Sequence, residues 1–94
     1  MERTTLARIL DATDGITGGK DGYRIGEDHR VSFYLGQAGQ AMEISDIDRC
    51  ELHEGYLAVH RRDHKGVLFA EYGAIYAVAC RAMREGESRR TGFA

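Results

Sequence analysis

The stretch VSFYLGQAGQAMEISDIDRCEL, residues 31–52, shares its pattern with the stretch VHRRDHKGVLFAEYGAIYAVAC, residues 59–80. Each stretch contains a strand pattern, a turn with glycine, a second strand pattern, a tight corner and a third strand pattern. The offset is 28 positions, and three of the 22 aligned pairs are identical: Val31 and Val59, Glu43 and Glu71, and Ile47 and Ile75. This weak internal repeat predicts a small antiparallel sheet that bends at two corners.

The length and composition of the chain limit the size and class of the fold. A chain of 94 residues, with 43% hydrophobic and 30% charged residues, suits a single globular domain with a modest core. Strand patterns extend over residues 23–80, and closing them into a barrel would remove edge strands, which invite aggregation. We therefore expect a mainly β fold, at the margin of α+β. It would be a small five- or six-stranded antiparallel meander barrel or roll with one N-terminal helix.

Three further segments flank or precede this sheet within the single domain, 1–94. A threonine at position 4 or 5 can cap a helix over residues 4–13. The stretch DGITGGKDG, residues 14–22, holds four glycines and predicts a flexible linker. Residues 81–94 are rich in arginine and poor in apolar side chains, which predicts a C-terminal tail.

A two-residue hairpin turn at Glu54-Gly55 determines which neighbouring side chains share a face of the sheet. It pairs Cys50 with Val59 on one face and Arg49 with His60 on the opposite face. The spacing of four side chains resembles that of zinc ligands: Cys50, His53, His60 and His64. Because the cysteine and the histidines face opposite ways, we expect no metal site, and no cofactor is indicated.

Other candidate motifs fail on spacing or charge. The stretch GITGGKD, residues 15–21, is one residue short of a P-loop, and Asp21 would repel the phosphate that Lys20 attracts. Glu43 and Glu71 occupy equivalent repeat positions, but no neighbouring group suggests a base with its orienting partner. We therefore expect that the protein is not an enzyme.

Aromatic residues on outer strand faces and in the tail favour protein recognition. Tyrosine has a polar tip on an apolar ring and is enriched at interfaces. The predicted partner-binding residues are Tyr34, Tyr56, Tyr76 and Phe93. We expect an interaction or assembly module that binds a protein partner or a second copy of itself as a homo-oligomer.

A basic hairpin tip and the basic tail favour an alternative, nucleic-acid binding. Lys and Arg side chains can contact a phosphate backbone, although a net charge of −2 gives the chain no bulk attraction to it. The residues predicted to bind nucleic acid are Arg61, Arg62, Lys65, Arg84, Arg89 and Arg90.

The expected location is cytoplasmic. The N-terminal stretch MERTTLARIL lacks the apolar segment of a signal peptide, and no apolar run approaches the roughly 18 residues of a membrane helix. Cys50 and Cys80 fall at apolar strand positions and are expected to be reduced and packed on one core face. No membrane partner is expected.

Overall fold

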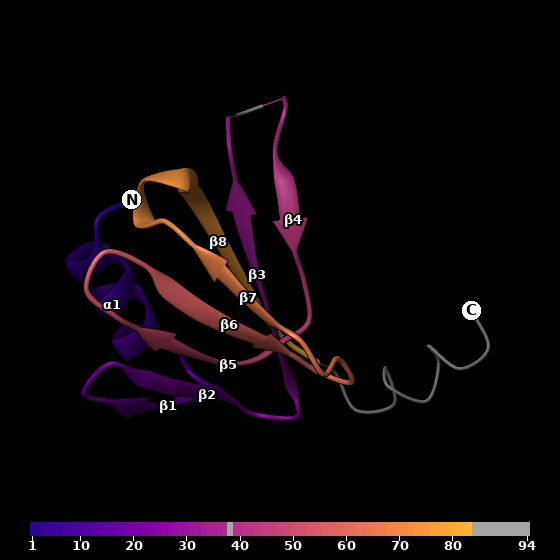
Figure 1. Ribbon diagram of the computed structural model, residues 1–94. Helices are drawn as coiled ribbons and strands as arrows, with labels where there is room; N and C mark the ends of the chain where they lie inside the picture. The colour runs from indigo at the N-terminus through magenta and orange to yellow at the C-terminus, as the bar shows by residue number, and fades with distance from the viewer. Residues whose placement is uncertain (38, 84–94) are drawn as a thin grey trace.

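The computed structural model describes residues 1–37 and 39–83 of the chain (Figure 1). This part contains one helix, α1 (Arg3–Ala12), eight strands and a 3₁₀ turn, η1 (Tyr72–Ala74). The strands are β1 (Ile16–Gly19), β2 (Gly22–Ile25), β3 (His29–Leu35), β4 (Met42–Ile44), β5 (Ile47–Leu52), β6 (Leu57–Arg61), β7 (Val67–Ala70) and β8 (Ile75–Ala82). The N-terminal helix is therefore present, and the tight corner of the second repeat copy is the 3₁₀ turn η1.

The strands of the described residues form two antiparallel sheets. One has the order β1-β2-β5-β6-β7 and the other the order β4-β3-β8 (Figure 1). The prediction of a mainly β fold with antiparallel sheets and an N-terminal helix is confirmed. Within residues 1–37 and 39–83, neither sheet is closed into a barrel, so the barrel or roll is not confirmed, and there are eight strands where five or six were expected.

The internal repeat corresponds to a symmetry in the order of the strands. Exchanging β3-β4-β5 with β6-β7-β8 converts the order β4-β3-β8 into β7-β6-β5, which is the order found in the larger sheet. The larger sheet differs only by the β1–β2 hairpin, which pairs with the outer edge of β5. Among the described residues, β7 and β4 are therefore equivalent edge strands of the two copies.

Residues 14–22 are not the linker that their glycine content predicts. They contain β1 and the turn into β2, and the turn residues Lys20 and Asp21 have φ values of 50° and 73°. The Asp21 carboxylate pairs with Arg3 at 2.7 Å, and its carbonyl accepts a 2.6 Å hydrogen bond from the Leu52 N–H. These contacts hold the hairpin against both the helix and β5. The glycines therefore supply backbone geometry here, not flexibility.

The helix begins one residue earlier than predicted and has no threonine cap. Its N-cap is Glu2, which makes no side-chain capping bond. The ammonium group of Met1 instead donates to the carbonyls of Tyr72 (3.0 Å) and Ile75 (2.7 Å), which ties the start of the helix to η1. Leu6 and Leu10 are fully buried, so the apolar stripe of the helix forms part of the core.

The core lies between the two sheets and the helix. Its fully buried side chains come from all three: Leu6, Leu10, Val31, Phe33, Ile44, Ile47, Cys50, Leu52, Leu57, Val59 and Ile75. Both cysteines are free thiols, but only Cys50 is buried. Cys80 is exposed in the second half of β8, where the described residues are exposed, so the prediction of a shared core face is wrong for it.

Candidate interaction surface

Strand β7 exposes two large apolar side chains on the outer face of the five-stranded sheet. Val67 is 42% exposed and Phe69 is 65% exposed, whereas the alternating residue Ala70 is buried. The pairing of β6 with β7 places Phe69 beside Ala58 and Val67 beside His60. Phe69 is the most exposed large apolar residue in the described part of the chain.

A predicted anchor, Tyr56, completes this patch. Its ring lies 5.9 Å from the ring of Phe69 in an edge-to-face arrangement and stacks on the ring of His53 at 4.9 Å. Ala58, beside Phe69 on the sheet, is only 2% exposed. We call Tyr56, Val67 and Phe69 the β7 surface. Aromatic side chains that already contact one another lose little conformational freedom on binding, which suits them as interface anchors.

Charged side chains adjoin the β7 surface around Glu51. Its carboxylate oxygens lie 3.6 Å from Nη1 of Arg49 and 3.7 Å from Nε2 of both His53 and His60. The carboxylate and Arg49 are both partly exposed, and exposed ion pairs contribute little to stability. This group gives the apolar patch a polar rim, as at ordinary protein interfaces.

The other predicted anchors lie on the second sheet. The rings of Tyr34 and Tyr76 are 6.4 Å apart, and the Tyr34 hydroxyl donates to Glu43 at 3.3 Å. The charge of Glu43 raises the pKa of Tyr34. The predicted tyrosines therefore divide between two sheets and do not form one surface. Phe93 lies outside the described residues.

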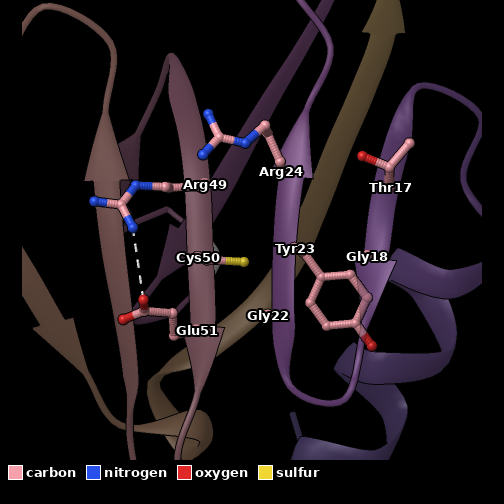
Figure 2. Close-up of a pocket in the computed structure, with 8 residues that line it drawn as sticks. All are labelled: Thr17, Gly18, Gly22, Tyr23, Arg24, Arg49, Cys50 and Glu51. Carbon is pink, nitrogen blue, oxygen red and sulfur yellow. Dashed lines mark ion pairs between the residues drawn. The ribbon is translucent and has the colours of Figure 1, made fainter.

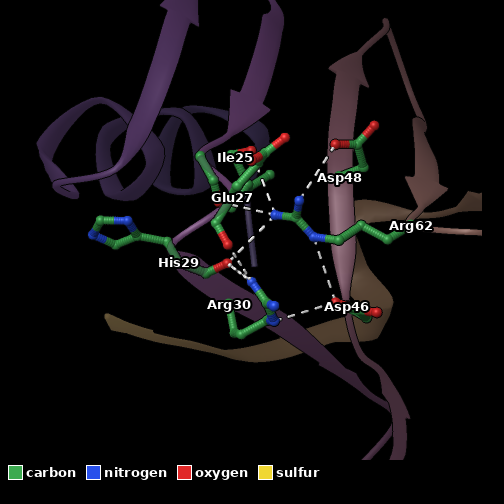
Figure 3. A network of polar contacts seen from close by, with 8 residues as sticks. Ile25, Glu27, His29, Arg30, Asp46, Asp48 and Arg62 are labelled. Carbon is green, nitrogen blue, oxygen red and sulfur yellow. Dashed lines mark hydrogen bonds and ion pairs between the residues drawn. The ribbon is translucent and has the colours of Figure 1, made fainter. Parts of the chain in front are cut away.

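The side chain of Arg62, which the sequence assigns to the basic hairpin tip, points toward Asp46, Asp48 and the β2–β3 loop (Figure 3). Its guanidinium lies 3.5 Å from the Asp46 carboxylate and 3.9 Å from that of Asp48. It also donates to three carbonyl oxygens, those of Ile25 (3.5 Å), Gly26 (2.9 Å) and His29 (3.4 Å). The Arg62 side chain is only 17% exposed. Its guanidinium connects the β2–β3 loop to the start of β5 through these intramolecular contacts.

Basic residues nevertheless form a row across the outer face of the larger sheet. Arg24 on β2 pairs with Arg49 on β5, which in turn pairs with His60 on β6. Beside this row is a hollow of about 360 Å³ whose wall includes Gly18 and Gly22, which carry no side chains (Figure 2). Its other lining residues are Thr17, Tyr23, Arg24, Arg49, Cys50 and Glu51. Arg24 places a positive charge at the rim of the hollow, while Arg49 is paired with Glu51 at 3.6 Å.

Of the basic tip, Arg61 and Lys65 remain at the surface. They line a second, strongly polar hollow of about 460 Å³, whose other lining residues include two acidic ones: Asp48, Arg49, His60, Arg62, Asp63 and His64. Nη2 of Arg61 lies 3.4 Å from Nδ1 of His64, the one side-chain contact of Arg61 in the described structure. The other predicted nucleic-acid contacts lie outside the described residues: Arg84, Arg89 and Arg90.

The predicted hairpin register is confirmed. Cys50 pairs with Val59, Arg49 pairs with His60, and Gly55 has a φ of 85° in the turn. Within residues 1–37 and 39–83, no three His, Cys, Asp or Glu side chains are grouped as metal ligands. Burial raises the pKa of the Cys50 thiol to about 12, which disfavours its reactive thiolate form.

Comparisons with known proteins add no assignment. The chain matches no protein-family model, and it has no significant match among curated proteins or solved structures. In the part of the chain that the structure describes, α1 is too short and too polar to cross a bilayer.

Proposed function

We propose that the protein is a non-enzymatic assembly module of the cytoplasm that self-associates through the β7 surface. The observation that carries this proposal is the exposure of Phe69 on an edge strand. Burying a phenylalanine side chain contributes about 1.5–3 kcal/mol, so a partner that covers the β7 surface is stabilised by removing Phe69 from water. Tyr56 and Val67 extend the same apolar area, and the Glu51 group supplies a polar rim.

The regularity of β7 supports a role in assembly. Edge strands are usually protected from pairing by charged residues, proline or bulges. The sequence of β7, VLFA, contains no charge and no proline, and its register with β6 runs without a shift. By contrast, the β3–β8 and β5–β6 pairings both contain a register shift. An apolar, regular edge next to exposed aromatic rings is therefore a template for another chain.

The substitution Phe69→Ser tests this proposal. We expect it to weaken self-association at least about tenfold, because it removes the largest exposed apolar side chain at the contact. Sedimentation velocity over a concentration series, from about 1 µM to about 1 mM, measures the effect. The matched control is Tyr76→Ser, which removes a 45% exposed ring from the other sheet and is expected to change nothing. A wild-type chain that stays monomeric throughout this range would contradict the proposal.

The basic row favours a second candidate function, binding of single-stranded nucleic acid. Like charges directly opposite each other destabilise a sheet, so the paired Arg24 and Arg49 would gain from a bound polyanion. We expect the double variant Arg24→Gln, Arg49→Gln to lower affinity for labelled single-stranded DNA and RNA. The titration uses about 50 and 200 mM salt, since phosphate contacts are lost steeply as salt rises. Absence of binding at the lower salt concentration would eliminate this candidate.

A further inference from the structure

We propose that the partner of β7 is the same strand of a second copy, paired antiparallel with Leu68 opposite Leu68. This inference rests on the proposed self-association and goes beyond it by naming the contact and its register. It follows from three properties of the strand: the direction of its free backbone groups, the alternation of its side chains, and the charges at its two ends.

The backbone groups on the free edge can be assigned from the neighbouring ladder. The His53 N–H donates to the Tyr56 carbonyl at 2.9 Å, so these two residues form a hydrogen-bonded pair at the hairpin turn. Hydrogen-bonded and non-hydrogen-bonded pairs alternate along an antiparallel ladder. Leu57 and Val59 of β6 therefore direct their N–H and C=O groups toward β7.

The partners of these two residues on β7 are Ala70 and Leu68, respectively. The N–H and C=O groups of Val67 and Phe69 therefore point away from β6, to the edge that has no strand beyond it in the described structure. When Leu68 lies opposite Leu68 of a second copy, Val67 of each copy faces Phe69 of the other. Each of these two pairs can exchange both of its N–H···O bonds.

The charges at the ends of β7 distinguish this register from its neighbours. Lys65 precedes Val67 by two residues and Glu71 follows Phe69 by two, and both are exposed. Glu71 keeps an extended backbone, with φ −84° and ψ 142°. Lys65 lies just outside β7, and extending the proposed register by two residues at each end brings Lys65 of each copy opposite Glu71 of the other. The dimer therefore gains two symmetry-related pairs of opposite charge.

The two adjacent registers that keep the same hydrogen bonding are less favourable. Centring the pairing on Val67 would place Glu71 opposite Asp63, which lies in the turn before β7 with a φ of 59° and cannot continue the ladder. Centring it on Phe69 would place the apolar side chain of Val67 opposite the charged Glu71. Only the register centred on Leu68 also brings the exposed apolar side chains Val67 and Phe69 together across the contact. Such cross-strand pairs of aromatic and β-branched residues stabilise sheets.

Charge reversal tests the register. We expect Lys65→Glu or Glu71→Lys alone to weaken dimerisation about fivefold or more at low salt, since two attractive pairs become repulsive. The double variant restores opposite charges across the contact and is expected to regain most of the affinity. Matched controls are Lys20→Glu and Glu27→Lys, which make the same changes of charge at exposed positions away from β7. Sedimentation velocity of the full chain measures all five variants.

Hydrogen exchange gives an independent readout of the edge. We expect the amides of Val67 and Phe69 to exchange more slowly as protein concentration rises, because their N–H groups become bonded to the second copy. If Phe69→Ser abolishes association but the charge variants match their controls and these amides stay unprotected, the β7 register is wrong. Self-association through the exposed face would then stand. A wild-type chain that is monomeric would overturn the proposed function together with this inference.

Discussion

Replacing Arg62 with methionine is expected to lower the free energy of unfolding by about 2 kcal/mol, because part-buried backbone carbonyls lose a charged hydrogen-bond donor. Methionine keeps most of the apolar stem but removes the guanidinium. The substitution removes the guanidinium from beside Asp48, whereas Asp46 keeps Arg30 at 3.6 Å. It also removes the donor that the Gly26 carbonyl meets at 2.9 Å. Equilibrium unfolding in urea measures the change.

The matched control is the adjacent residue. Arg61→Met makes the same chemical change at an exposed contact with His64, and we expect it to alter stability by less than about 0.5 kcal/mol. Equal urea midpoints of unfolding for the two variants would show that the contacts of Arg62 contribute no more to stability than those of an exposed arginine. Comparing the two variants also separates an effect on stability from an effect on nucleic-acid binding, because of these two arginines only Arg61 makes its side-chain contact at the exposed basic tip.

The different roles of Arg61 and Arg62 show that a run of charged residues does not reveal which of them makes long-range contacts. The run HRRDHK predicts a solvated basic tip, because each residue by itself favours water. Arg62 instead meets Asp46 at the preceding corner and backbone carbonyls of the β2–β3 loop, more than 30 positions earlier in the chain. No local pattern contains that contact. The sequence did contain the acidic side of the network, since Asp46 and Asp48 alternate around Ile47.

Local turn chemistry explains which parts of the fold could be predicted. The pairing of Cys50 with Val59 follows from a two-residue hairpin whose second residue is glycine, and it is confirmed. Barrel closure depends instead on how distant strands meet, and the pattern of the repeat does not determine this. The repeat predicted a small antiparallel sheet with two corners, and the related order of strands in the two sheets is seen only in the structure.

The candidate surface was only partly predictable for the same reason. Tyr56 was predicted as an anchor because it stands at a polar-facing position beside a turn. Val67 and Phe69 were missed, although their alternation in VLFA was visible, because a core strand and an exposed edge strand share that pattern. Only the sheet order shows that β7 has no strand beyond it among the described residues.

The second large expected effect is a loss of folding stability on the substitution Gly18→Ala, in the hairpin of residues 14–22. An added Cβ would lie 2.1 Å from the Gly22 carbonyl oxygen, and the backbone φ of 130° is one that L side chains rarely adopt. Neither atom of this clash is the end of a flexible side chain. We expect a loss of at least about 2 kcal/mol of stability, from backbone strain together with opening of the β1–β2 hairpin. Urea unfolding measures the loss.

Gly22→Ala is the control for this substitution, because a Cβ at Gly22 meets no atom within 4 Å and its φ lies outside the left-handed range. We expect its stability to stay close to that of the wild type. Trypsin adds a local readout: opening the hairpin would expose the bond after Lys20, so Gly18→Ala should be cut there faster than Gly22→Ala. A flexible linker would tolerate both substitutions equally. Indistinguishable unfolding and cleavage would therefore contradict the hairpin and restore the linker that the glycine content predicts.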